Sequence, residues 1–116
     1  MCKKYRIGID AGGTKVAYGL FDADGQPLDR MQHPTDINAD GPAFSDRMIE
    51  TIREIEKKHN LKNEDLQGIG ICMPSYILFD SGYVYLTSAL TNIRDFPMKE
   101  YLQERLPGVK IVLDND

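Results

Sequence analysis

Short runs of apolar residues alternate along this chain with polar, glycine-containing segments, a pattern that predicts five strands. The predicted strands are residues 5–10, 15–21, 27–32, 66–73 and 109–113. Pro27 cannot donate a backbone hydrogen bond, which predicts an edge position for the third strand. The fourth strand is a continuous apolar run, and such a run is typical of a strand that is covered on both faces.

Helical periodicity follows the third strand. Apolar residues recur at helical spacing at Phe44, Met48, Ile49, Ile52 and Ile55. This spacing predicts an amphipathic helix over about residues 42–59, with basic side chains near its carboxyl end, where the helix dipole favours them. A shorter second helix is predicted over residues 97–106. Two apolar segments between the helices, 76–79 and 83–86, flank a turn signal and predict a small hairpin.

The order of these elements indicates the fold class. The first three strands are joined by short turns and form a meander, whereas the later strands return through crossover connections. This order predicts an α/β fold with a mixed five-stranded sheet, helices on its faces and a small β-hairpin excursion. With 116 residues the chain is expected to form one domain.

Composition and charge narrow the classes of partner. Lys and Arg number 14 and Asp and Glu number 18, so the formal net charge is −4. An acidic balance without a basic run argues against nucleic acid as the main partner. Cys2 and Cys72 have the spacing of neither a disulfide framework nor a zinc site. Neither a membrane-spanning segment nor the apolar core of a signal peptide is evident, so we expect a cytoplasmic protein without a membrane partner.

The first candidate site is the glycine-rich segment from Asp10 to Lys15, between the first two strands. It is not a Walker loop, and a strand rather than a helix follows it. A glycine-rich turn can instead gather the backbone N–H groups of Gly12 and Gly13 into an anion-binding nest, with the Thr14 hydroxyl and Lys15 ammonium as further donors. Asp10 is suited to holding Mg²⁺ through water. A plain hairpin with Asp10 as a turn residue is the alternative interpretation.

The second candidate site is Asp114-Asn115-Asp116, which follows the last predicted strand. Open α/β sheets bind ligands beyond the carboxyl ends of their strands, and phosphoryl transfer to an alcohol needs a carboxylate that accepts the hydroxyl proton. We interpret Asp116 as that carboxylate, Asn115 as a partner for sugar hydroxyls, and Asp114 as a turn or supporting residue. An Asp-rich loop without chemistry is the alternative interpretation.

Together these segments resemble the ROK family (repressors, open reading frames and sugar kinases), within the hexokinase–actin–Hsp70 ATPase superfamily. Ile7-Gly8-Ile9-Asp10-x-Gly12-Gly13-Thr14-Lys15 is similar to the first phosphate motif of that family, and Val112-x-x-Asn115-Asp116 to its catalytic motif. The resemblance implies that residues 1–116 form the N-terminal, RNase H-like (actin-like ATPase) lobe of a sugar kinase, with the C-terminal lobe absent from this chain. The implied reaction is glucokinase-like, with ATP phosphorylating a hexose or an N-acetyl amino sugar.

The resemblance also implies roles for single residues. Asp116 would be the general base and Asn115 would bind sugar hydroxyls. Asp10 would face Mg²⁺ through water. The ATP phosphates would face the four residues Gly12, Gly13, Thr14 and Lys15.

Less specific parts of the resemblance concern the sugar pocket. Thr91 and Asn92 lie where relatives carry a short stretch beside the sugar, although an ordinary polar loop explains them equally well. Ser75 occupies a glycine position near the pocket, and the bulky Tyr76 follows it. This departure from the family pattern concerns the identity of the sugar substrate and the presence of kinase activity. Structural Zn²⁺ and the contacts of a homodimer would belong to the missing C-terminal part.

Other interpretations of the same residues remain open. A ROK-type sugar-sensing transcriptional regulator or a non-catalytic sugar-binding protein is the first. Such a regulator carries a helix-turn-helix domain ahead of the phosphate motif, and here only about five residues come before the first predicted strand. An actin- or Hsp70-like ATPase module with a protein ligand is the second, and Asn115-Asp116 favours a small hydroxylated substrate instead. We expect the chain alone to be inactive, because catalysis needs both substrates clamped in a closed cleft.

Overall fold

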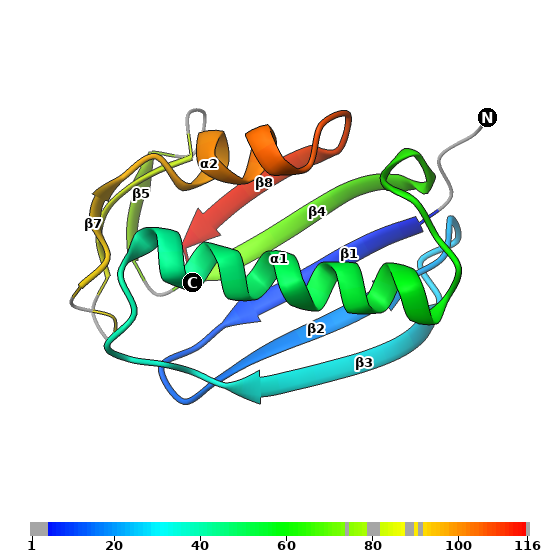
Figure 1. Cartoon of the computed structure of the whole chain (residues 1–116), viewed down its shortest axis with the longest axis horizontal. Coiled ribbons are helices and arrows are strands. Elements are labelled where there is room, and N and C mark those ends of the chain that lie inside the picture. Colours follow the sequence, from blue (N-terminus) through cyan, green and yellow to red (C-terminus); the bar gives the residue numbers. More distant parts are fainter. Residues whose placement is uncertain (1–4, 74, 79–81, 88–89, 91, 116) are drawn as a thin grey trace.

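The computed structural model describes residues 5–73, 75–78, 82–87, 90 and 92–115. Its centre is a mixed five-stranded sheet in the order β3-β2-β1-β4-β8 (Figure 1). The strands are β1 (Tyr5–Ala11), β2 (Lys15–Phe21), β3 (Pro27–Pro34), β4 (Leu66–Met73) and β8 (Lys110–Asn115). The β1–β2 and β2–β3 pairs are antiparallel, and the β1–β4 and β4–β8 pairs are parallel. The α/β class, the mixed sheet and the edge position of β3 are therefore confirmed.

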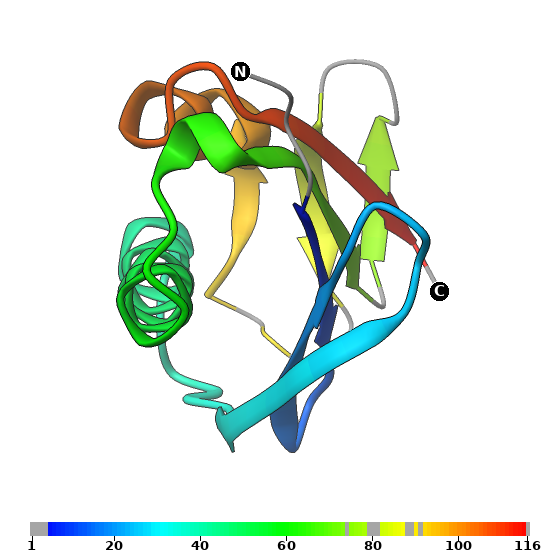
Figure 2. The same cartoon turned by 90° about the vertical axis from the view of Figure 1, so that its right-hand side faces the viewer.

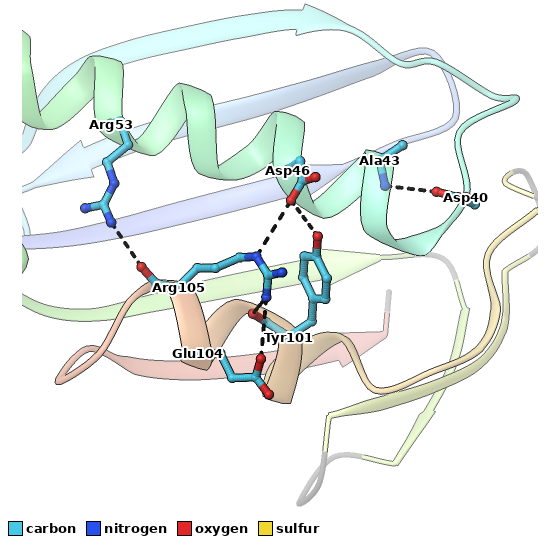
Figure 3. Close-up of polar contacts among 7 residues, drawn as sticks. All are labelled: Asp40, Ala43, Asp46, Arg53, Tyr101, Glu104 and Arg105. Carbon is cyan, nitrogen blue, oxygen red and sulfur yellow. Dashed lines mark hydrogen bonds and ion pairs between the residues drawn. The ribbon is translucent and has the colours of Figure 1, made fainter.

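The long helix α1 (Gly41–Lys58) agrees closely with its prediction. The Asp40 carboxylate caps its first turn by accepting a 2.9 Å hydrogen bond from the Ala43 backbone N–H (Figure 3). Its apolar stripe, which includes Phe44, Met48 and Ile52, is buried against the sheet. The short helix α2 (Met98–Arg105) buries Met98 and Leu102. A 3-10 turn, η1 (Asn63–Asp65), precedes β4.

Both helices cover the same face of the sheet, to the left in Figure 2. Burial along β4 alternates accordingly, with Ile69 and Ile71 buried and Gly70 and Cys72 exposed. The prediction that this strand is covered on both faces is thus wrong for the part of the chain that the structure describes. The apolar run gave a wrong prediction of burial on both faces, because two of its residues, Gly70 and Cys72, are small and tolerate exposure to solvent.

A second, three-stranded sheet stands beside the first, in the order β5-β6-β7 (Figure 1). It consists of β5 (Ser75–Leu78), β6 (Tyr83–Thr87) and β7 (Arg94–Phe96), and both of its strand pairs are antiparallel. The predicted hairpin corresponds to β5 and β6. The sequence did not predict β7, because three residues with the sequence Arg-Asp-Phe carry no alternating pattern and Asp95 has a positive φ of 49°.

Polar side chains join the two helices at the surface (Figure 3). The Tyr101 hydroxyl of α2 donates a 2.7 Å hydrogen bond to the Asp46 carboxylate of α1. In the opposite direction, the Arg53 guanidinium of α1 donates a 3.0 Å hydrogen bond to the Arg105 backbone carbonyl. These contacts fix α2, and with it the strand that follows, relative to α1.

Among the described residues, neither helix combines the length and the hydropathy that a membrane span requires.

Candidate functional site

Three parallel strands bring Asp10, Cys72 and Asp114 into one row across the sheet. Asp10 of β1 is in register with Cys72 of β4, which is in register with Asp114 of β8. All three are exposed on the face opposite the helices. Because neighbouring strands lie about 4.8 Å apart, the Cα atoms of Asp10 and Asp114 are about 10 Å from each other. A hollow of about 690 Å³ on this face is lined by these residues and by glycines, among them Gly8, Gly19 and Gly70.

The parallel direction of β1, β4 and β8 brings both candidate motifs to one edge of the sheet. The turn that contains Gly12 and Lys15 follows the carboxyl end of β1, and Asp116 follows β8 in the sequence. Asp116 itself lies outside the described residues. The strand pairing therefore brings the carboxyl end of β8 to within about two strand spacings of the carboxyl end of β1, at the sheet edge where open α/β sheets bind ligands.

The structure corrects the prediction for Asp114. This residue belongs to β8, as does Asn115, whose backbone is in register with Met73 of β4. The predicted strand ended at residue 113 because acidic and amide side chains are unfavourable in strands. Pairing with β4 overrides that local preference and places the Asp114 side chain on the open face of the sheet instead of in a turn.

The β1–β2 hairpin forms the phosphate turn (residues 12–15). The Gly12 backbone N–H donates a 3.0 Å hydrogen bond to the Lys15 carbonyl, so it is used within the hairpin. In the part of the chain that the structure describes, positive φ angles at glycine occur at Gly25, Gly82 and Gly108, not in this turn. The predicted nest built on the Gly12 and Gly13 N–H groups therefore differs from the observed turn, because hairpin pairing takes one of the two donors.

Other donors of the phosphate turn remain available. The backbone N–H groups of Gly13 and Thr14 make no hydrogen bond to any described residue. The Thr14 and Lys15 side chains are exposed. Glycine suits position 12, because a Cβ there would lie 3.1 Å from the Lys15 carbonyl oxygen, a tight contact. The turn thus offers two amides, a hydroxyl and an ammonium group to an anion.

Asp10 lies beside the phosphate turn, and its carboxylate was predicted to hold Mg²⁺ through water. Within the described ranges, no three His, Cys, Asp or Glu side chains gather as they would around a metal. One exposed carboxylate fits Mg²⁺ nonetheless, since this ion keeps several waters and takes its other ligands from substrate phosphates. Asp10 could hold such an ion through water, together with a bound nucleotide.

Of the predicted sugar-binding residues, Asn92 is the one whose side chain is described. Its Nδ2 donates a 2.8 Å hydrogen bond to the Asn38 backbone carbonyl, in the connection between β3 and α1. Its neighbours Leu90 and Ile93 are fully buried. Ser75 begins β5 and its backbone is in register with Thr87, but its side chain and the whole of Thr91 lie outside the described residues.

Thr35 contacts the phosphate turn and was missed in the sequence. Its hydroxyl donates a 2.8 Å hydrogen bond to the Gly12 carbonyl, and its backbone N–H donates a 2.9 Å bond to the Thr14 carbonyl. The sequence around it shows only a polar segment after a strand. No local pattern reveals the contact, because it depends on the pairing of β2 with β3.

Comparison with known proteins identifies relatives along nearly the whole chain. The model of the ROK family matches residues 6–116. A glucokinase from Halalkalibacterium halodurans is 30% identical over 120 residues, which cover 100% of this chain and 34% of the relative. The chain therefore spans about a third of the length of this curated relative.

Solved structures extend the comparison to the fold. A ROK family glucokinase from Streptomyces griseus, in complex with glucose and AMPPNP, is 26% identical with a TM-score of 0.74, covering 96% of this chain and 33% of that one. A ROK family transcriptional regulator described as a homolog of the E. coli MLC protein has a TM-score of 0.81 at 15% identity, covering 97% of this chain and 28% of that one. At that identity the likeness to the regulator concerns the fold alone.

Proposed function

The chain belongs to the ROK family, and from this membership we propose that it is the N-terminal lobe of an ATP-dependent sugar kinase. The reaction transfers the γ-phosphoryl group of ATP to a hydroxyl of a hexose or N-acetyl amino sugar. One observation supports the proposal: parallel pairing of β1, β4 and β8 brings the phosphate turn and the carboxyl end of β8, which Asp116 follows in the sequence, to the same edge of one sheet. Donor and acceptor in a phosphoryl transfer have to meet in this way.

The residues of the phosphate turn have roles toward the donor. The N–H groups of Gly13 and Thr14 and the Lys15 ammonium bind phosphate oxygens. Asp10 holds Mg²⁺ through water, and the ion, when bound, neutralises charge that develops on the phosphates. Gly12 closes the hairpin through its hydrogen bond to the Lys15 carbonyl, which a side chain at this position would crowd.

The residues after β8 have roles toward the acceptor. Asp116 accepts the proton of the attacking sugar hydroxyl, and Asn115 orients the sugar through its amide. Ser75, Thr91 and Asn92 line or support the sugar pocket. A glucokinase relative that matches the whole chain, and a glucokinase structure that holds glucose and AMPPNP, support this assignment.

A regulator that senses sugar without turnover is the second candidate. The Ser75-Tyr76 sequence favours it, because Ser75 stands at a position where the resemblance to the family implies a glycine. Sugar binding without phosphorylation would distinguish this function from a kinase.

The whole protein is proposed to act in the cytoplasm, as a homodimer, with any structural Zn²⁺ in its C-terminal part. The 116-residue chain alone is proposed to bind sugar and nucleotide weakly and to be inactive, since it spans about a third of a related glucokinase and a closed cleft needs both of its walls. Turnover by the chain alone at an ordinary kinase rate would contradict this part of the proposal.

The decisive experiment measures coupled ADP release by the whole protein with a panel of hexoses and N-acetyl hexosamines. Asp116→Asn should abolish turnover, with a loss of at least about 100-fold, while sugar binding is retained. Asp24→Asn is the matched control, because Asp24 is an exposed carboxylate in the β2–β3 turn at the other end of the hairpin. Turnover that persists in Asp116→Asn would refute the assigned base. Sugar binding without any turnover in the unaltered protein would favour the regulator.

A further inference from the structure

Thr35 holds the phosphate turn at two points. It follows β3, where Pro34 is in register with Lys15, and so reaches the turn from the neighbouring strand. Its hydroxyl bonds the Gly12 carbonyl at 2.8 Å and its N–H bonds the Thr14 carbonyl at 2.9 Å. In a closed two-residue hairpin the Gly12 carbonyl would bond the Lys15 N–H instead. Thr35 therefore provides the hydrogen bond to the Gly12 carbonyl that the Lys15 N–H would provide in a regular hairpin.

The orientation of these carbonyls determines where the turn presents its donors. In a planar trans peptide the C=O and the N–H point in opposite directions. Because the Gly12 carbonyl points at Thr35, the Gly13 N–H points away from it. The half-buried Thr35 thereby keeps one electronegative carbonyl out of the space that an anion would occupy, and turns one free amide toward that space.

Thr35 can act as an anchor because the connection it opens is itself fixed. In the β3–α1 connection (residues 35–40), the Asp36 carboxylate accepts a 3.0 Å hydrogen bond from the Asn38 N–H. Asn92 binds the Asn38 carbonyl, and Asp40 caps α1. The connection is thus held at its middle and at its far end, so its near end has a defined position.

We propose that Thr35 is a positioning residue for the donor phosphates: its hydroxyl orients the Gly12–Gly13 peptide so that the Gly13 N–H faces a phosphate oxygen. This inference rests on the proposed function, because it needs a nucleotide at the phosphate turn. Thr35 itself does not contact the nucleotide in this proposal; it acts through the Gly12–Gly13 peptide.

The test compares Thr35→Val with Thr35→Ser in the whole protein. Valine keeps the shape of threonine and removes the hydroxyl, whereas serine keeps the hydroxyl. AMPPNP binding by calorimetry and the KM for ATP should weaken about tenfold in Thr35→Val, the effect of one lost hydrogen bond, and should recover in Thr35→Ser. The affinity for the sugar in the absence of nucleotide should stay unchanged in both. Thr51→Val is the control for stability, because the Thr51 hydroxyl in α1 donates to the Arg47 carbonyl and accepts from the Arg47 guanidinium, so the variant loses hydroxyl bonds outside the turn.

The outcomes separate this inference from the proposed function. Unchanged AMPPNP affinity in Thr35→Val, or an equal loss in Thr35→Ser, would overturn the role of the hydroxyl. An equal loss in Thr51→Val would assign the effect to general stability and would also overturn it. If the unaltered protein binds AMPPNP but phosphorylates no sugar, the kinase proposal fails while the comparison of variants still decides the role of Thr35. If it binds no AMPPNP, both proposals fail.

Discussion

The side-chain amide of Asn92 donates a 2.8 Å hydrogen bond to the backbone carbonyl of Asn38, 54 residues earlier in the chain. One of its two amide hydrogens is therefore used to hold the β3–α1 connection. Asn92 was predicted to bind sugar, and this contact gives it a supporting role in addition. It links the connection in front of α1 to the segment in front of β7.

Asn92→Asp tests the supporting role. A carboxylate oxygen would face the Asn38 carbonyl in place of a donor, so the connection should loosen, with a loss of about 1 kcal/mol or more. Hydrogen exchange of the amides of residues 36–40 should become faster. Asn38→Ala is the matched control, because it keeps the backbone carbonyl that Asn92 binds. Equal exchange in Asn92→Asp and the unaltered chain would contradict the role.

The salt-bridged Asp29 predicts a loss of stability in acid. Its carboxylate receives 2.8 Å and 2.9 Å contacts from His59 and Lys58 at the carboxyl end of α1. Hydrogen bonds from His59, then Lys58 and the Arg30 N–H, hold the pKa of Asp29 well below its ordinary value of 3.8. A lowered pKa means that the stabilisation is complete above about pH 4 and is lost as the pH falls further.

Urea unfolding of Asp29→Asn between pH 3 and pH 7 measures this loss. The variant should be less stable than the unaltered chain at neutral pH, and the difference should shrink below pH 4. Asp24→Asn, an exposed carboxylate outside this cluster, should show no such difference. If the difference in unfolding free energy between Asp29→Asn and the unaltered chain stays constant down to pH 3, the charge of Asp29 is not responsible for it.

The buried Tyr18 predicts an alkaline transition. Its hydroxyl lies 2.8 Å from His33 Nε2, and burial raises the pKa of Tyr18 to about 12. Because the folded pKa exceeds the ordinary value of 10, the stabilisation is present below pH 10 and is lost between pH 10 and about 12. The phenolate absorbance of the unaltered chain minus that of Tyr18→Phe should titrate near pH 12. Titration of this difference near pH 10 would be inconsistent with a buried hydroxyl.

Close packing at Gly41 predicts a specific steric defect. A Cβ at this position would lie 2.5 Å from the Phe96 ring. Gly41→Ala should therefore lower the free energy of unfolding by about 1–3 kcal/mol, although alanine favours helices. Adding Phe96→Leu should recover part of this loss. Gly70→Ala is the matched control, since a Cβ at Gly70 meets nothing within 4 Å. Additive losses in the double variant would exclude the proposed clash.

Sequence patterns predicted the elements that bury long apolar stripes. The spacing of Phe44, Met48 and Ile52 located α1 within one residue at each end, because nothing competes with a helix at that spacing. The strand β8 runs two residues beyond its prediction, because pairing with β4 outweighs the preferences of Asp114 and Asn115. Local signals were weakest where tertiary pairing decides the structure.

The same limit applies to the candidate site. The phosphate turn was located from its glycines, yet hairpin pairing uses the Gly12 N–H, and only the three-dimensional contact reveals it. Thr35 lies 23 residues from Gly12 and has no motif of its own. The roles assigned to Asp116, Asn115, Thr91 and Ser75 remain predictions.

The β3–α1 connection touches the phosphate turn through Thr35 and the segment of Asn92 through Asn38. If nucleotide and sugar both bind next to this one piece of backbone, whichever ligand binds first would restrict its remaining motion and lower the entropic cost for the second. Such synergy is reciprocal by thermodynamic necessity: sugar must strengthen nucleotide binding by the same factor by which nucleotide strengthens sugar binding. In the proposed kinase, a connection of six residues would in this way favour the binding of both ligands together.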